Sequence, residues 1–202
     1  MLEELRQLIM FVDEKYKYIS DLWENSNIFN KINFKKNTVR NIYNSNKMIN
    51  EIYLYRSYVN NKNLELLLEF ENLNLKSKIE KRVKSQNSIQ YKINKYITKN
   101  DNGEIPINKC LNDIYGVRII LEENVEYNRI QKFIKDNFLN LKCIDASKEQ
   151  YKAIHIYFKK DNYSFPWELQ IWNKSEEQSN KISHKNYKQE YTKWEQQIKK
   201  EE

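Results

Sequence analysis

The chain contains only two glycines, Gly103 and Gly116, among its 202 residues. A P-loop needs several glycines so that backbone N–H groups can surround a phosphate, and a dinucleotide-binding turn needs three. Neither motif can form here, so any phosphate bound by this chain must be held by side chains. The segment 101–109, DNGEIPINK, combines Asn-Gly turn chemistry with one of two prolines and is the clearest predicted loop.

The composition predicts a globular protein that folds without disulfides or a structural metal. Hydrophobic residues make up 40% of the chain and charged residues 31%. No apolar run approaches the roughly 18 residues of a bilayer-spanning helix, and the N-terminus lacks a signal-peptide pattern. We therefore expect a cytoplasmic protein with no membrane partner. Cys110 and Cys143 lack zinc-binding spacing with the two histidines, and we expect reduced thiols.

The hydrophobic periodicity changes near residue 75. Before it, apolar residues at three- and four-residue spacing predict amphipathic helices over 2–23, 39–59 and 65–73. After it, the pattern predicts strands over 75–84, 113–122, 139–147, 151–160 and 167–173, with helices near 85–98, 125–138 and 174–199. This order predicts an α/β (mixed α+β) fold with a central mixed sheet of about five strands flanked by helices. We expect an N-terminal helical region over 1–75 and a second domain over 76–202.

The positive charge is concentrated in one segment. The formal net charge is +7, and residues 76–100 contain eight Lys and Arg residues against one Glu. A general nucleic-acid binder usually spreads its charge over a face, whereas a local cluster suits a compact anion such as a polyphosphate. A solvated lysine-rich helix remains the alternative.

Four residues of this segment have spacings that bring them together. Arg82 and Lys84 are two apart, so on a strand they share a face, and Ser88 and Lys92 are four apart, so on a helix they share a face. A strand that leads into a helix also presents the positive end of the helix dipole, which favours phosphate. A capped surface helix without a ligand is the structural alternative.

Two carboxylates occur on separate predicted strands. Asp113 precedes a strand that contains Gly116 and Arg118, and Glu168 lies in FPWELQIWN. A pair of carboxylates can bind Mg²⁺ and leave room for phosphate oxygens, although a lone aspartate at a strand end is often only a cap. In 167–173, Leu169 and Ile171 should face the core, so Glu168 shares the opposite face with Gln170 and Trp172. It should point into a cleft and need not be buried.

The strand over 151–160 has one apolar face and one polar face. Ile154, Ile156 and Phe158 alternate on the predicted core side, while Tyr151 and His155 share the other. An aromatic ring can stack on a base and an imidazole can bind phosphate or ribose. The structural alternative is a partly exposed tyrosine and histidine without a ligand.

Four motifs in order resemble the synthetase domain of the RelA/SpoT-type (p)ppGpp synthetases, over about residues 75–190. They are R-x-K-x3-S-x3-K from Arg82, D-x-x-G-x-R from Asp113, Y-K-A-I-H from Tyr151, and E-L-Q-I from Glu168 with a distal His184. In size the chain resembles the small alarmone synthetases, a family that includes toxic relatives. The resemblance implies a nucleotidyltransferase-like synthetase fold over 76–202.

The resemblance also implies the activity and the roles of the motif residues. The reaction is transfer of the β,γ-pyrophosphate of ATP to a ribose 3'-hydroxyl with release of AMP. Asp113 and Glu168 would be the catalytic residues and would bind Mg²⁺, and Glu168 would also accept the hydroxyl proton. The implied ATP-binding residues are Arg82, Lys84, Ser88, Lys92 and Arg118. The implied acceptor-binding residues are Lys148, Tyr151, His155, Gln170, Glu177 and His184.

Three alternatives stay open for the function, and the first two differ in the acceptor. The first is GDP or GTP, which would give (p)ppGpp. The second is the 3'-CCA end of tRNA, as in toxic relatives that block translation and are controlled by an antitoxin protein; Trp172 in place of a family arginine and Glu177 in place of an asparagine leave room for it. The third is an inactive nucleotide- or RNA-binding module. Candidate RNA contacts are Lys31, Lys35, Lys36 and Arg40.

Overall fold

A five-stranded sheet forms the centre of the computed structural model, which describes residues 1–26, 28, 30–99 and 101–201. The strands run in the order β1-β2-β5-β4-β3. The parallel pair β2–β5 lies between antiparallel pairs. The predicted mixed sheet is therefore confirmed. The strand bounds are β1 (Lys78–Val83), β2 (Tyr115–Leu121), β3 (Lys142–Asp145), β4 (Ile154–Phe158) and β5 (Trp167–Asn173).

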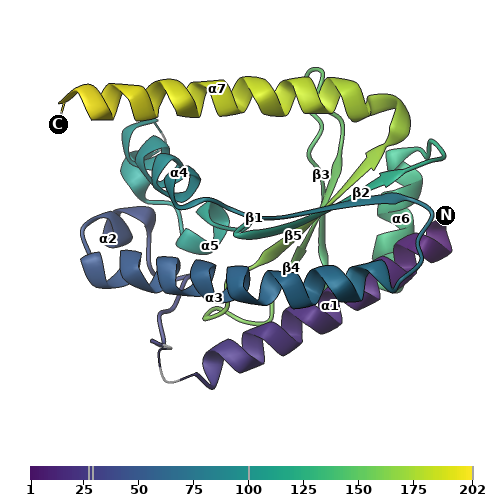
Figure 1. The fold of residues 1–202 in the computed structure, drawn as a ribbon, viewed down its shortest axis with the longest axis horizontal. Helices are drawn as coiled ribbons and strands as arrows, with labels where there is room; N and C mark the ends of the chain where they lie inside the picture. The colour runs from purple at the N-terminus through teal and green to yellow at the C-terminus, as the bar shows by residue number, and fades with distance from the viewer. Residues whose placement is uncertain (27, 29, 100, 202) are drawn as a thin grey trace.

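Helices flank the sheet, as expected. Figure 1 shows the two long N-terminal helices, α1 and α3, along one side of the molecule and the C-terminal helix α7 along the opposite side. The helix bounds are α1 (Leu2–Glu24), α2 (Val39–Tyr43), α3 (Asn46–Glu71), α4 (Gln86–Lys99), α5 (Ile107–Cys110), α6 (Tyr127–Asn137) and α7 (Glu177–Glu201), with 3-10 turns η1 (Asp101–Gly103) and η2 (Lys174–Glu176).

The sequence prediction of the N-terminal helices needs a correction. The helix expected over 39–59 is interrupted after Tyr43, and the separate helix expected over 65–73 is the end of the 26-residue α3. The interruption occurs because the Ser45 side chain accepts a hydrogen bond from the Met48 amide and so caps a new helix. The polar residues after Val59 do not end α3. Leu66 follows Val59 by seven residues, or two helical turns, so both lie on the same buried side of one continuous helix.

The N-terminal helices and the sheet share one hydrophobic core. The Trp167 ring of β5 packs edge-on against Tyr16 of α1 at 5.6 Å between centroids, and its Nε1 donates to the Tyr55 hydroxyl of α3 at 2.9 Å. Phe165 stacks on Tyr55 at 4.6 Å. One buried hydrophobic cluster therefore includes residues from both sides of residue 75. The division into 1–75 and 76–202 stays a prediction.

Strands β4 and β5 differ in what covers their second face. In β4 the predicted apolar positions Ile154, Ile156 and Phe158 are buried, and the residues between them are half-buried. In β5 every residue is buried, including Glu168 at 5% exposure. The expectation that Glu168 need not be buried is therefore wrong, because neighbouring side chains cover this face as well.

The predicted loop over 101–109 contains the 3-10 turn η1 and the start of α5. Asn102 and Gly103 both have left-handed backbone conformations, with φ of 49° and 78°. A Cβ added at Gly103 would lie 2.5 Å from Ile97 Cδ1. This position therefore requires glycine.

Among the described residues, none of the helices combines the length and the apolar composition that a membrane crossing requires.

Replacing Trp167 with alanine should lower the free energy of unfolding by about 3–5 kcal/mol, because a fully buried ring and its bond to Tyr55 are lost. Urea unfolding followed by circular dichroism measures this. As a control, Leu139→Ala, at a residue that is 86% exposed, should change the value by less than about 0.5 kcal/mol. Equal effects of the two substitutions would contradict a core shared by α1, α3 and β5.

Candidate functional site

A cleft of about 600 Å³ opens on the sheet face opposite α1 and α3. Its walls come from the end of β1, the first turns of α4, strands β4 and β5, and α7. The volume lies in the usual range of small-molecule sites, about 300–1,000 Å³. It brings together most of the predicted site residues: Arg82, Lys84, Ser88, Lys92, Asp113, Lys148, Tyr151, His155, Glu168, Gln170 and His184.

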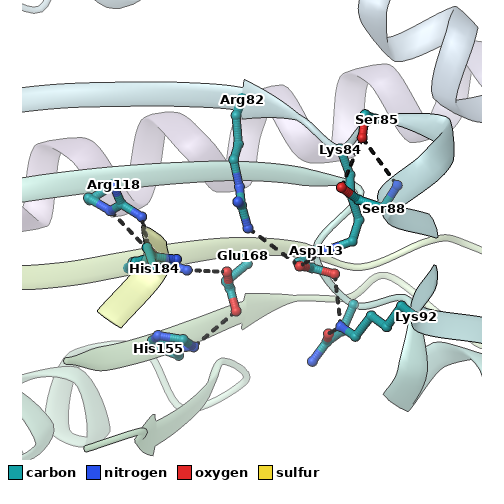
Figure 2. Close-up of polar contacts among 12 residues, drawn as sticks. Arg82, Lys84, Ser85, Ser88, Lys92, Asp113, Arg118, His155, Glu168 and His184 are labelled. Atoms are coloured by element: carbon teal, nitrogen blue, oxygen red, sulfur yellow. Dashed lines mark hydrogen bonds and ion pairs between the residues drawn. The ribbon is translucent and has the colours of Figure 1, made fainter. Parts of the chain in front are cut away.

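Three cations surround the Asp113 carboxylate at one end of the cleft. Lys84 Nζ lies 2.5 Å from Oδ2 and Lys92 Nζ lies 3.1 Å from Oδ1. Arg82 Nη2 approaches Oδ2 at 3.5 Å. Figure 2 shows Arg82 extending from β1 and Lys84 and Lys92 approaching from the region of α4. The predicted convergence of the basic motif on one point is therefore found in the structure.

The charges in this cluster shift the pKa values of Asp113 and its two lysine partners. Burial acts to raise the pKa of Asp113, but Lys84, Lys92 and Arg82 outweigh it and hold that pKa far below its ordinary value. Burial lowers the pKa of Lys84, and the neighbouring cations add to this, against the attraction of Asp113. For Lys92, burial is outweighed by Asp113, which raises the pKa. Asp113 is thus a permanent anion that neutralises only part of the local positive charge.

The start of α4 adds polar groups to the same end of the cleft. The Ser85 hydroxyl accepts a hydrogen bond from the Ser88 amide at 3.2 Å, and its backbone carbonyl accepts from Ile89 at 3.1 Å. The Ser85 hydroxyl donates to Ser88 Oγ at 2.8 Å. Ser88, in the first turn of a 14-residue helix whose start carries the positive end of the helix dipole, borders the same cleft as the cations.

The Arg82 side chain lies beside Gly116. The two residues are paired across β1 and β2, and a Cβ added at Gly116 would lie 3.6 Å from Arg82 Nε. Because 3.6 Å is an ordinary contact, the position has room for a methyl group.

Glu168 lies in the middle of the cleft and is held by three side chains. His155 Nδ1 lies 2.9 Å from Oε1, the Tyr157 hydroxyl donates to Oε1 at 3.1 Å, and Gln170 Nε2 donates to Oε2 at 2.7 Å. Burial acts to raise the pKa of Glu168, but the contacts with His155 and Gln170 outweigh it and the repulsion by Asp113, so the pKa is lowered.

Arg118 lies outside the cleft that holds the other predicted ATP-binding residues. Its guanidinium donates to Glu80 Oε2 at 2.9 Å and to Gln170 Oε1 at 2.9 and 3.1 Å. Its Cζ also lies 3.6 Å from the centroid of the Trp172 ring. The contact with Gln170 follows from the strand register, because Arg118 of β2 and Gln170 of β5 are paired residues on neighbouring strands. Its assignment to ATP stays a prediction.

His184 joins α7 to this group. Its Nε2 lies 3.2 Å from Arg118 Nη2, and its ring stacks on Trp172 at 5.5 Å between centroids. Burial, followed by the charges of Arg118 and Arg82, lowers the pKa of His184 to about 4. The imidazole is therefore neutral near pH 7 and accepts a hydrogen bond from Arg118.

Tyr151 and Lys148 form the far end of the cleft. A tight turn joins them through two backbone hydrogen bonds of 2.8 Å, with Glu149 in the left-handed region at φ 50°. The Tyr151 hydroxyl lies 2.8 Å from His155 Nε2. Its ring stands edge-on to Trp172 and His184. Lys148 is exposed, so this end has an exposed cation beside a largely buried aromatic ring.

Two sets of predicted contact residues lie away from the cleft. Glu177 pairs with Lys181 at 2.5 Å on α7, and that contact, helped by other nearby lysines, outweighs the effect of burial and lowers the pKa of Glu177. In the proposed RNA patch, Arg40 pairs with Glu104 at 3.0 Å, while Lys35 and Lys36 are exposed. The remaining member, Lys31, lies over the ring of a nearby tyrosine.

The donor set fits a hard divalent cation. In the part of the chain that the structure describes, no group of three or more His, Cys, Asp or Glu side chains is arranged to hold a metal ion. Asp113 and Glu168 are two buried carboxylates beside one cleft. Mg²⁺ is commonly held by one or two carboxylates together with phosphate oxygens and water, so this pair fits Mg²⁺ when a phosphate is present.

Tyr157 contacts a predicted site residue and Ser85 borders the cleft, but neither was predicted as a site residue. Tyr157 donates to Glu168, and the two-residue period places it on the same face as His155, so the signal was present. Ser85 caps α4 and borders the cleft. Tyr91 and Ser183 also border it, and the sequence carries no clear signal for either.

The family model described as "Region found in RelA / SpoT proteins" matches residues 81–192, more than half of the chain. Small alarmone synthetase 1 from Bacillus subtilis is similar at 20% identity over 70% of this chain and 80% of that one, with a TM-score of 0.43. For small alarmone synthetase 2 from the same organism the values are 20%, 69%, 79% and 0.40. No curated protein matches the sequence.

Protonation of His184 should reduce the stability of the folded protein. The unfolded chain binds this proton below about pH 6.5, its ordinary pKa, but the folded protein binds it only near pH 4. Stability should therefore be complete above pH 6.5 and fall between these values. We expect a steeper fall in the free energy of unfolding for the wild type than for His184→Gln, measured by urea titration at several pH values. Parallel curves would contradict a buried neutral imidazole.

Proposed function

Because this chain belongs to the RelA/SpoT family, we propose that it is an ATP-dependent pyrophosphokinase whose acceptor is GDP or GTP. In this reaction the ribose 3'-oxygen forms a bond to the β-phosphorus of ATP. The bond between the β-phosphorus and the oxygen that bridges it to the α-phosphorus breaks, and AMP leaves with that oxygen. The products are AMP and a guanosine nucleotide that carries a 3'-pyrophosphate.

The observation that carries the proposal is the cluster of cations around Asp113. Arg82, Lys84 and Lys92 meet one carboxylate beside a helix N-terminus. One anion cannot neutralise three cations, so the cluster has positive charge available for phosphates. We propose that the ATP phosphates bind Lys84, Ser88 and Lys92 and that Arg82 contacts the adenosine part. Phosphoryl-type transfer needs mainly such positioning and charge neutralisation.

Asp113 and Glu168 are the proposed ligands of Mg²⁺. The ion would neutralise charge on the transferred phosphates as a Lewis acid. Both carboxylates border one cleft. Gly116, three residues after Asp113, is paired with Glu168 in the parallel β2–β5 ladder. Each carboxylate now accepts hydrogen bonds from protein donors, and ligand binding would exchange some of these contacts.

The proposed acceptor site is the other half of the cleft. The Tyr151 ring would stack on the guanine base, and Lys148 would contact the acceptor's phosphates. His155 and Gln170 hold the Glu168 carboxylate in place at 2.9 and 2.7 Å. That carboxylate would accept the proton of the 3'-hydroxyl as the new bond to phosphorus forms.

Purified protein with Mg²⁺ and ATP labelled at the β-phosphate should release AMP and transfer label to GDP or GTP. A parallel reaction with deacylated tRNA separates the two acceptors. Label on tRNA alone would refute the guanosine acceptor and favour the toxic relatives; Lys35→Glu with Lys36→Glu should then reduce transfer. No label on either acceptor, from folded protein, would refute the enzymatic proposal.

Asp113→Asn and Glu168→Gln should each reduce the rate of transfer at least about 100-fold, the usual loss when charge stabilisation in a transition state is removed. Asp136→Asn, at an exposed carboxylate of α6, is the matched control and should keep the wild-type rate. Thermal unfolding shows whether each variant is folded. Wild-type turnover by either cleft variant would exclude the proposed metal pair.

A further inference from the structure

The N-terminal region reaches the proposed phosphate site through Arg56. This residue lies on α3, outside the matched residues 81–192, and its Nε donates to the backbone carbonyl of Lys84 at 3.0 Å. Arg56 is half-buried and does not border the cleft itself. Any effect on the cleft must therefore act through Lys84 or through its charge.

Lys84 is fixed at three atoms. Its amide donates to the Ile114 carbonyl at 2.8 Å, its carbonyl accepts from Arg56, and its ammonium contacts Asp113 at 2.5 Å. Ile114 and Asp113 both precede β2. Arg56 is the only one of these partners that comes from the N-terminal helices, so it links α3 to the junction between β1 and α4.

The peptide that Arg56 holds also sets the start of α4. Ser85 follows directly, and its hydroxyl accepts from the Ser88 amide while its carbonyl accepts from Ile89. A rotation of the 84–85 peptide would therefore move the helix cap and Ser88 together with the Lys84 side chain. Both groups are proposed phosphate contacts, so a small displacement at this peptide affects both.

The charge of Arg56 has a second consequence. In the described part of the chain no carboxylate pairs with its guanidinium, whose Nε is the donor to Lys84. A cation near a helix N-terminus opposes the helix dipole. An anion bound at the start of α4 would reverse this unfavourable interaction, because it would attract both the dipole and Arg56.

We infer that Arg56 is a positioning residue for the donor nucleotide: it fixes the Lys84–Ser85 peptide from α3 and adds positive potential at the start of α4. The inference rests on the proposed function, because the ligand it concerns is the polyphosphate of ATP. It gives the N-terminal helices a part in donor binding in addition to their part in the core.

Binding of α,β-methylene ATP with Mg²⁺, measured by isothermal titration calorimetry, tests this. The α–β bridge of that analogue cannot be cleaved, so binding is separated from turnover. Arg56→Gln should weaken binding about tenfold, because a charge-assisted hydrogen bond and a nearby cation are lost. Arg56→Lys should recover part of the loss, since it keeps the charge without the planar fork. Lys62→Gln on α3, whose partner is Glu65, is the control and should bind as the wild type does.

Steady-state kinetics supply the second readout. Arg56→Gln should raise the KM for ATP and leave the KM for the guanosine acceptor unchanged, at a temperature well below the measured Tm of every variant. A lower Tm with wild-type binding and KM values would show that Arg56 only satisfies a buried carbonyl, and the inference would fail. If the wild type itself does not bind the analogue, the proposed function fails, and the inference falls with it.

Discussion

A carboxylate that is almost wholly removed from water keeps its charge only when opposite charges are placed against it. Asp113 is 7% exposed and is surrounded by Lys84, Lys92 and Arg82. The cluster ties together β1, α4 and the residues before β2, three segments whose apolar side chains also share the hydrophobic core. Because the cluster has excess positive charge, the side chains that hold these segments together can also bind phosphate. Stability and proposed function therefore depend on one set of side chains.

The parallel pairing of β2 and β5 organises the rest of the site. Gly116 and Glu168 are paired, as are Arg118 and Gln170. Asp113 precedes the strand of the first pair, and Asp113 and Glu168 both border one cleft. The second pair begins the network to His184, which attaches α7 over the same face. On the opposite face, Trp167 packs on Tyr16 and contacts Tyr55, so the long N-terminal helices support the strand that carries Glu168.

Short-range periodicity predicted much of the fold and of the site. The two-residue period placed Arg82 with Lys84, and the four-residue period placed Ser88 with Lys92. The contacts of Arg82, Lys84 and Lys92 with Asp113 were not predicted. The break in the N-terminal helices was missed, because Ser45 caps a helix inside a continuous apolar pattern. Contacts between segments distant in the chain carry no such period. The turn of Arg118 toward Gln170, the burial of Glu168 and the bond from Arg56 could therefore not be predicted from the sequence.

The central claim is that the cations around Asp113 form the binding site of the ATP phosphates. A crystal structure with α,β-methylene ATP and Mg²⁺ tests it most directly. We expect phosphate oxygens within hydrogen-bonding distance of Lys84 Nζ, Ser88 Oγ and Lys92 Nζ, with the lysine contacts to Asp113 given up in part. An analogue bound elsewhere, with Lys84 and Lys92 still paired to Asp113 as they are now, would contradict the account.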